Sequence, residues 1–248
     1  GELYQFNLNS PQYDMFGNQT GDFLPEPIIP FCDEWPSSYK LNREKEMIGI
    51  YISGHPLDDY RHEIEAFCPA NVGMLADFAA NKGRDLFFAA IVTSVEHRLT
   101  KSGDPFGTLT FEDYTDQFKL NIFKENYLRY KHFMVPGTFL TLRGRIEIPR
   151  YRNELEFVVS SIELLDDLRD KKTKNIQLTI SNSDLDNLLI DELNGIFTAN
   201  NGNTPVEFNI VDHLDGFEVK LPSRSIKVRP GTELYKELQR LNVLFKLN

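Results

Sequence analysis

Aromatic, hydroxyl and cationic side chains alternate with apolar ones between residues 100 and 123, where the sequence predicts a loop and two strands joined by a tight turn. Because successive side chains of a strand point to opposite sides, one side gathers the apolar residues Leu109, Phe111, Phe118, Leu120 and Ile122. The other side presents Phe106, Thr108, Thr110, Lys119, Asn121 and Phe123. Aromatic rings stack on nucleobases, and cations pair with phosphates. The second side is therefore a candidate surface for single-stranded nucleic acid.

Further cations surround these two strands. The segment 149–153 places Tyr151 between Arg150 and Arg152, so that guanidinium groups can pair with phosphates while a base stacks on the ring. One alternative is a solvated hairpin tip, since two glutamates follow closely; the outward phenylalanines can equally pack under a helix or a neighbouring domain. The candidate nucleic-acid-binding residues are Arg98, Lys101, Phe106, Lys119, Phe123, Arg143, Arg145, Arg150, Tyr151 and Arg152.

Residue patterns for catalysis are absent from the sequence. It contains no glycine-rich phosphate loop, no nucleophile elbow and no cluster with metal-ligand spacing. His55 precedes Asp58 and Asp59, but no second ligand lies at fixed helical spacing, so a histidine that caps or packs in a turn is the favoured interpretation. We expect no catalytic residue, metal or cofactor in this chain.

The strands that position the candidate surface follow a recognisable order. Three segments of period two precede a helical segment, and two more follow it: Leu86–Arg98, Phe106–Asp113, Gln117–Phe123, the helix Lys124–Met134, Thr138–Ile148 and Glu154–Leu165. Three strands, a helix and two strands predict a five-stranded OB-fold barrel with a helix between strands 3 and 4. A generic antiparallel sandwich is the rival, and the helix in that position disfavours it.

The remaining segments complete a β plus α+β fold in four parts. We predict an extended, irregular arm over residues 1–40, a helical connector over 41–83, the OB-fold domain over 84–165 and a small α+β domain over 166–248. The last domain begins with a charged hinge at 166–174. It continues with a strand at 176–180, a helix capped by Ser183, a hairpin through Asp215 and Gly216, and a closing helix at 233–241.

Charge and composition limit the class of protein further. The net charge is -10, with a balance of -8 in residues 1–83, zero in 84–165 and -2 in 166–248. A neutral OB domain predicts weak, local contacts with nucleic acid instead of field-driven binding. No apolar run approaches the roughly 20 residues that span a bilayer. With no basic, apolar leader and only two cysteines, we expect a cytoplasmic protein and no membrane partner.

The N-terminal arm carries a second kind of signal. Gln12 is followed, after two intervening positions, by Met15 and Phe16 in an extended acidic segment that resembles a bacterial sliding-clamp-binding peptide. The two apolar side chains would fill a pocket on the partner, while the glutamine amide fixes the register. The alternative is that both apolar residues fold back onto the core of this chain.

Two longer segments resemble one protein family. The run from Glu44 to Leu57, which contains Gly54-His55-Pro56-Leu57, and the stretch from Thr100 to Phe123 are similar to the alpha subunit of bacterial DNA polymerase III, DnaE type. The resemblance implies a non-catalytic C-terminal fragment, with the catalytic palm and PHP domain upstream. It also implies that the OB domain binds single-stranded DNA template, that the arm binds the sliding clamp (beta), and that the C-terminal domain contacts the clamp-loader tau subunit. The tau contact follows from domain position alone.

Two other functions remain open at this point. The strand pattern also fits the OB-fold anticodon-binding appendage of an aminoacyl-tRNA synthetase, although the GHPL segment and the arm have no place in that architecture. A third possibility is an OB module that binds only other proteins.

Overall fold

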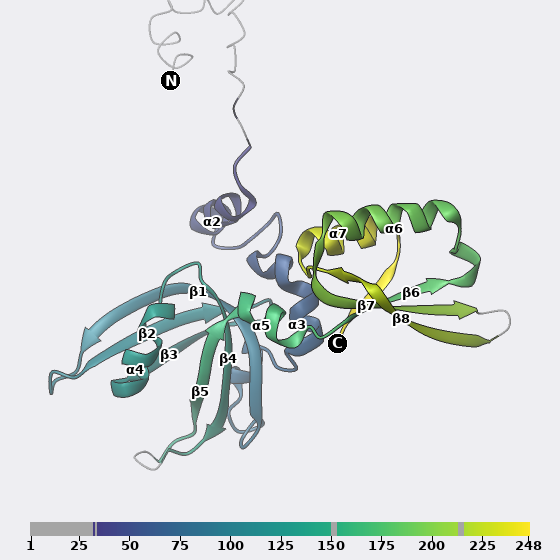
Figure 1. Cartoon of the computed structure of the whole chain (residues 1–248). Coiled ribbons are helices and arrows are strands. Elements are labelled where there is room, and N and C mark those ends of the chain that lie inside the picture. The colour runs from purple at the N-terminus through teal and green to yellow at the C-terminus, as the bar shows by residue number, and fades with distance from the viewer. Residues whose placement is uncertain (1–31, 33, 150–152, 213–215) are drawn as a thin grey trace, which may run out of the picture.

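The computed structural model describes residues 32, 34–149, 153–212 and 216–248. Two β-sheet units lie on either side of a helical connector (Figure 1). The first sheet has five strands and the second has four. Within the described residues, no helix has both the length and the apolar character required to cross a membrane.

The first unit has the predicted order of elements. Strands β1 (Asp85–Leu99), β2 (Pro105–Glu112) and β3 (Gln117–Phe123) precede helix α4 (Lys124–Tyr130) and a 3-10 turn at Lys131–Phe133. Strands β4 (Phe139–Glu147) and β5 (Glu156–Leu164) complete the unit. Every neighbouring pair is antiparallel, and the spatial order is β3-β2-β1-β4-β5. The prediction of an OB-type sheet with a helix between strands 3 and 4 is confirmed.

The sheet differs in one respect from the closed barrel that the sequence predicted. Strands β3 and β5 are the two edges of the sheet, and the described residues form no ladder between them. The sheet nevertheless encloses one apolar core, in which Phe88, Leu109, Phe111 and Leu142 are fully buried. Helix α4 covers the core from one side. At Gly107 an added Cβ would lie 2.5 Å from Met134 Cε, so any larger residue would displace the Met134 side chain.

The connector consists of short helices. Helix α2 (Ser37–Ile48) ends at Gly49, whose φ of 87° is the left-handed conformation that suits glycine. The helix therefore ends at the first glycine that follows it. A 3-10 helix (η1, Pro56–Tyr60), helix α3 (Arg61–Phe67) and a second 3-10 helix (η2, Val72–Ala76) follow.

The predicted charged hinge at 166–174 is mostly a helix. Helix α5 (Leu165–Lys172) carries three acidic and three basic residues, but Leu165 and Leu168 are buried against Leu57 and Ala89. The helix was not predicted because these six charged residues outnumber the two leucines of its apolar face. This face fastens α5 to the connector and to β1.

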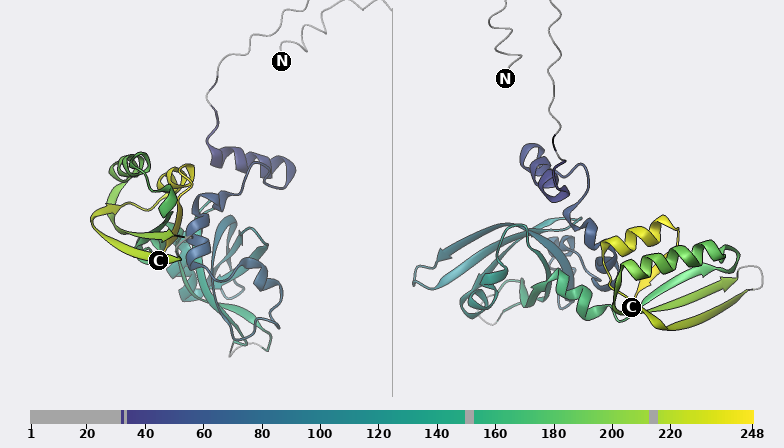
Figure 2. Two further views of the ribbon diagram at one scale, coloured as in Figure 1. Left: turned by 90° about the vertical axis from the view of Figure 1, so that its right-hand side faces the viewer. Right: turned by 45° about the horizontal axis from the view of Figure 1, so that its top comes forward.

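The C-terminal unit is the predicted small α+β domain. Its elements are β6 (Ile176–Ser181), a 3-10 turn (η4, Asn182–Asp184), α6 (Asn187–Ala199), β7 (Asn201–Asp212), β8 (Phe217–Val228), α7 (Thr232–Arg240) and β9 (Leu244–Leu247). The sheet order is β8-β7-β6-β9, and both helices cover one face (Figure 2). The cap of α6 is Asp186, which accepts from Leu189 N–H, and not Ser183. The predicted hairpin is confirmed, whereas β9 was not predicted.

Candidate nucleic-acid interface

A row of three side chains crosses the outer face of the first sheet. Arg98 on β1 lies opposite Phe106 on β2, which lies opposite Phe123 on β3. The two phenylalanine rings stack, with centroids 5.1 Å apart and planes 17° from parallel. Phe123 is 40% exposed. The row therefore presents an aromatic surface beside a guanidinium group, and we name it the stacking row.

Two parallel rows lie next to the stacking row. Glu96, Thr108 and Asn121 form the first, and Ser94, Thr110 and Lys119 form the second. Thr108 is buried by its neighbours and donates a hydrogen bond to Asn121 Oδ1 (2.8 Å). Its hydroxyl therefore supports the surface, whereas Lys119 is an exposed cation on it.

A single carboxylate lies between the two predicted cations of this face. Glu96 forms an ion pair with Arg98, and its Oε1 lies 3.9 Å from Lys119 Nζ. All three side chains are at least two-fifths exposed, so these pairs contribute little to stability and exchange readily. Sequence reasoning did not include Glu96, although its position two residues before Arg98 already placed both on the same side of β1.

The loop between β1 and β2 is tightly organised and carries Lys101 at its exposed tip. Asp104 N–H donates to Thr100 Oγ1 (3.0 Å), and Ser102 Oγ donates to Asp104 Oδ2 (3.0 Å). Gly103 takes a φ of 87°, which favours glycine at this turn. Lys101 is thus held on an ordered loop directly after the strand that carries Arg98.

Arg143 and Arg145 are not part of the stacking row. Both lie on β4, where they pair in register with Phe87 and Asp85 at the opposite end of β1 from Arg98. The Arg143 guanidinium lies over the Phe87 ring (4.9 Å), and Arg145 Nε is 3.9 Å from Asp85 Oδ1. They form a separate exposed pair of cations, which the strand pattern alone did not reveal.

Six predicted residues lie outside the described residues. They are Arg150, Tyr151 and Arg152 of the loop between β4 and β5, and Gln12, Met15 and Phe16 of the arm. Their roles remain predictions.

The connector covers only the far end of the outer face. Glu112 of β2 is buried there and forms an ion pair with Lys45 of α2. Tyr51 also packs here, and its burial, followed by its hydrogen bond to Glu112, raises its pKa. These contacts leave Phe123 and Arg98 exposed at the other end of the strands.

His55 acts as a cap and packs in a turn, as the sequence predicted. Leu57 N–H donates to His55 Nδ1 (3.1 Å), and the ring lies 4.4 Å from the ring of Tyr114. Burial lowers the pKa of His55, which keeps Nδ1 available as an acceptor. Asp58 accepts from His55 N–H (2.6 Å), so the two residues complete a capping box. In the described part of the chain, no group of histidine, cysteine or carboxylate side chains is placed to hold a metal ion.

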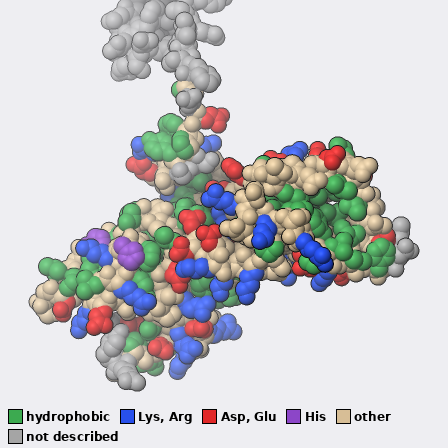
Figure 3. Space-filling view, viewed as in Figure 1, with side chains coloured by type: hydrophobic (Ala, Val, Ile, Leu, Met, Phe, Trp, Pro, Cys, Tyr) green, Lys and Arg blue, Asp and Glu red, His purple; other side chains and the backbone are tan. Residues whose placement is uncertain are grey.

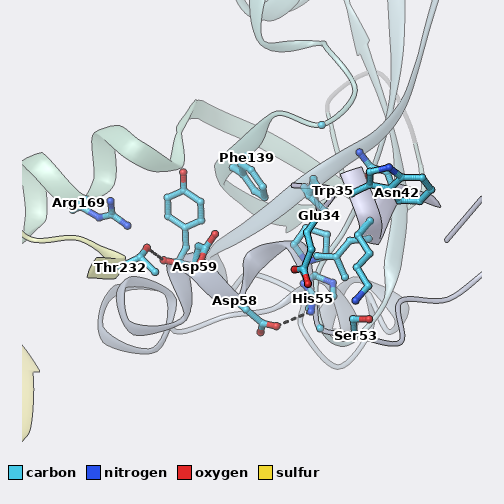
Figure 4. Close-up of a pocket in the computed structure, with 17 residues that line it drawn as sticks. Glu34, Trp35, Asn42, Ser53, His55, Asp58, Asp59, Phe139, Arg169 and Thr232 are labelled. Carbon is cyan, nitrogen blue, oxygen red and sulfur yellow. Dashed lines mark hydrogen bonds between the residues drawn. The ribbon is translucent and has the colours of Figure 1, made fainter. Parts of the chain in front are cut away.

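This segment forms one wall of a cavity of about 570 Å³ between α2, the first sheet and the C-terminal unit (Figure 4). Its polar groups largely satisfy one another: the Asp58–His55 hydrogen bond crosses one end, and Thr232 Oγ1 donates to the Asp59 carbonyl (3.0 Å) at the other. Phe139 and Ile91 line the side nearest the sheet. The arrangement is that of a junction between parts of the molecule.

Charge is mixed over the first unit. On the face drawn in Figure 3, basic and acidic side chains are interspersed, and neither sign forms a continuous patch. Together with the zero balance of residues 84–165, this distribution gives the first unit no long-range positive field.

The fold and the stacking row define an OB-fold unit of the nucleic-acid-binding type, followed by a small mixed α+β domain. Residues 87–165 match the family described as OB-fold nucleic acid binding domain. Residues 176–248 match the family described as DNA polymerase III alpha subunit, C-terminal domain.

Curated relatives extend the similarity over most of the chain. The DNA polymerase III subunit alpha of Borreliella burgdorferi is 32% identical over 202 residues, covering 78% of this chain and 17% of the relative. That of Vibrio cholerae serotype O1 is 24% identical and covers 93% of this chain and 20% of the relative. The chain is therefore similar to the C-terminal region of DNA polymerase III alpha subunits, which confirms the resemblance seen in residues 44–57 and 100–123. It spans about a fifth of the length of these relatives.

Solved structures align only with part of the chain. The small single-stranded DNA-binding protein from Streptomyces coelicolor is 12% identical, covers 33% of this chain and 92% of that chain, and has a TM-score of 0.26. This value is too low to support a functional argument.

Proposed function

We propose that this chain is the non-catalytic C-terminal part of a replicative DNA polymerase III alpha subunit, in which the OB unit holds single-stranded DNA template. The observation that carries the proposal is the stacking row, where Phe106 and Phe123 stack beside Arg98 on an exposed face. Two or three successive bases can continue this stack, while Arg98, Lys101 and Lys119 pair with phosphates.

We expect the OB unit to bind single-stranded DNA weakly. Each stacked base contributes about 1–3 kcal/mol, and Glu96 offsets part of the positive charge of Arg98 and Lys119. A polymerase that is tethered to its template raises the effective concentration of the strand at the OB unit, so weak contacts suffice.

The arm and the C-terminal unit would provide the tethering. Gln12, Met15 and Phe16 would bind the sliding clamp, and the C-terminal unit would dock the clamp-loader tau subunit. Both assignments rest on the similarity to polymerase alpha subunits. The surface of the C-terminal unit, where hydrophobic side chains gather (Figure 3), supports only the second; its exposed apolar residues include Leu188, Ile190, Phe217, Val219 and Leu221.

The central experiment measures binding of a fluorescent ssDNA of about 15 nucleotides by anisotropy at two salt concentrations. We expect the double variant Phe106→Ala/Phe123→Ala to lose affinity by about tenfold or more, because two stacking surfaces disappear. Phe217→Ala is the matched control, since Phe217 is about as exposed as Phe123 but lies on β8 of the C-terminal unit. Unchanged binding by the double variant would reject the stacking row.

The same titration separates the alternative functions. Preference for ssRNA over ssDNA of equal sequence would favour an anticodon-binding appendage, because only RNA offers a 2′-hydroxyl. No binding to either strand would favour a module that binds only proteins.

A second experiment tests the arm. We expect Met15→Ala/Phe16→Ala to abolish binding to purified sliding clamp and to leave ssDNA affinity intact, because the apolar anchors act on a different partner from the OB unit. Clamp affinity is measured by surface plasmon resonance. A double variant that still binds the clamp as tightly as the parent chain would reject the peptide.

A further inference from the structure

A pocket of about 500 Å³ opens between β3 and β5, where the sheet is not closed by a ladder. Its floor is apolar: Leu120, Ile122, Tyr130 and Phe157 are buried. The Tyr130 hydroxyl donates to the Ser160 carbonyl (3.1 Å), so the polar end of this side chain is satisfied and its ring is left to line the pocket. The floor can therefore receive a flat apolar face.

The rim of the pocket is polar and carries both signs of charge. Asn121 of β3, Lys124 and Asn126 of α4 and Glu156 of β5 line it. Asn121 Oδ1 accepts from Thr108, which turns its amide N–H groups away from β2. Lys124 has a φ of 51°, an uncommon backbone conformation for a residue with a Cβ. Such conformations concentrate at ligand sites, where the surrounding structure holds them in place.

The pocket continues directly from the stacking row, because Phe123 belongs to both. A strand that stacks on Phe106 and Phe123 reaches the pocket at the edge of β3. There, Lys124 would lie beside the next phosphate, and the amide groups of Asn121 and Asn126 would lie beside the edge of an entering base. Ligand sites typically combine an apolar cavity of this size with a few convergent polar groups.

We propose that this pocket binds one nucleobase of a single strand, turned out of the stack at the edge of β3. The proposal rests on the proposed ssDNA-binding function. The base packs against Phe157 and Val159, whose side chains face the core side of β5, Asn121 and Asn126 meet its hydrogen-bonding edge, and Lys124 pairs with the adjoining phosphate. A peptide strand between β3 and β5 is the competing occupant; the aromatic, amide and cationic groups of the rim favour the base.

The test uses ssDNA oligonucleotides of one sequence, each with a single abasic site at a different position, and measures anisotropy with the full chain. We expect one position at which loss of the base lowers affinity about tenfold more than at the other positions outside the stacked bases. Val159→Trp fills the pocket from β5, and this variant should bind the intact strand only as well as the parent chain binds the strand with that abasic site. In this variant the penalty at that position disappears.

Two further variants keep the result interpretable. Ser161→Trp is the matched control, because Ser161 also lies on β5, pairs with Arg143 of β4 and does not line the pocket. Asn126→Trp fills the pocket from an exposed position of α4 and replaces Val159→Trp if that variant does not fold.

Three outcomes would overturn the base pocket. They are equal effects of all abasic sites, unchanged ssDNA affinity in both filled variants, and loss of clamp or tau binding in the filled variants with ssDNA binding intact, which would assign the pocket to a peptide. In each case, the effect of Phe106→Ala/Phe123→Ala on ssDNA affinity tests the proposed ssDNA-binding function separately from the pocket. Absence of ssDNA binding in the parent chain would instead reject that function.

Discussion

Glu96 controls how much positive charge the outer face offers to a phosphate backbone. It lies between Arg98 and Lys119 and contacts both. In the proposed complex with a single strand, its charge would repel the phosphates that approach the two cations. A residue that was absent from the predicted site is therefore expected to set its strength.

This role gives a prediction for Glu96→Gln. The change removes one negative charge without altering size, so ssDNA affinity should rise severalfold at low salt, and the slope of log affinity against log salt should become steeper. Anisotropy titrations over a salt series provide the measurement. Asp77→Asn, an exposed carboxylate on the connector, is the charge-matched control. Equal gains in both variants would mean that only the net charge matters.

At the scale of elements, the short 3-10 helix η1 depends on a neutral histidine. His55 Nδ1 accepts the first hydrogen bond of the helix, and burial lowers the pKa of the ring. Protonation would remove that acceptor and place a charge in a partly buried site. The pKa of Asp58 is also lowered: its burial would raise it, but the hydrogen bond from His55 N–H and the Arg61 contact outweigh that effect.

The sign of the pH dependence follows from these shifts. Because the folded state holds His55 below its usual pKa, the unfolded chain binds more protons, and stability falls as the pH drops below about 6.5. We expect His55→Asn, which retains a good cap without titrating, to show a smaller loss of stability between about pH 7 and about pH 5.5. Urea unfolding followed by circular dichroism measures both. Parallel pH profiles for the two proteins would contradict this role of His55.

At the scale of the whole molecule, one buried carboxylate joins three segments that are distant in sequence. Glu63 of α3 is fully buried and forms an ion pair with Arg169 of α5. Its Oε1 also accepts from the Tyr235 hydroxyl of α7 (3.1 Å). Burial would lower the pKa of Arg169, but the nearby Glu63 charge outweighs it, and the net direction is upward. The connector thus binds the OB unit and the C-terminal unit through one shared charge.

Removing this carboxylate should loosen the junction. Glu63→Ala leaves Arg169 without its partner in a mostly buried site, which costs about 3–5 kcal/mol when a buried pair is broken. Lys171→Ala is the matched control on α5, since its ion pairs are exposed and contribute about 1 kcal/mol or less. The free energy of unfolding in urea is the readout. A loss in Glu63→Ala no larger than that of the control would show that apolar packing alone holds the units together.

Local sequence patterns predicted the elements that depend on near neighbours. Strand β3 begins and ends where period-two alternation indicated, and the helix between strands 3 and 4 lies in its expected place. Alternation also placed Phe106 and Phe123 on the same side of the sheet, because a two-strand register needs only the turn between the strands; their stacking on each other was not predicted. Helix α5 escaped prediction because its charges outnumber its two buried leucines.

Contacts between distant segments could not be predicted, because local periodicity carries no information about them. The sharing of Glu96 by two cations, the separation of Arg143 and Arg145 from the stacking row, and the junction at Glu63 all arise from strand order and packing. The open edge between β3 and β5 is of the same kind, since whether two strands pair is decided by the curvature of the whole sheet. Residue types thus specify the chemistry of the surface, and the tertiary arrangement specifies which of those groups can act together.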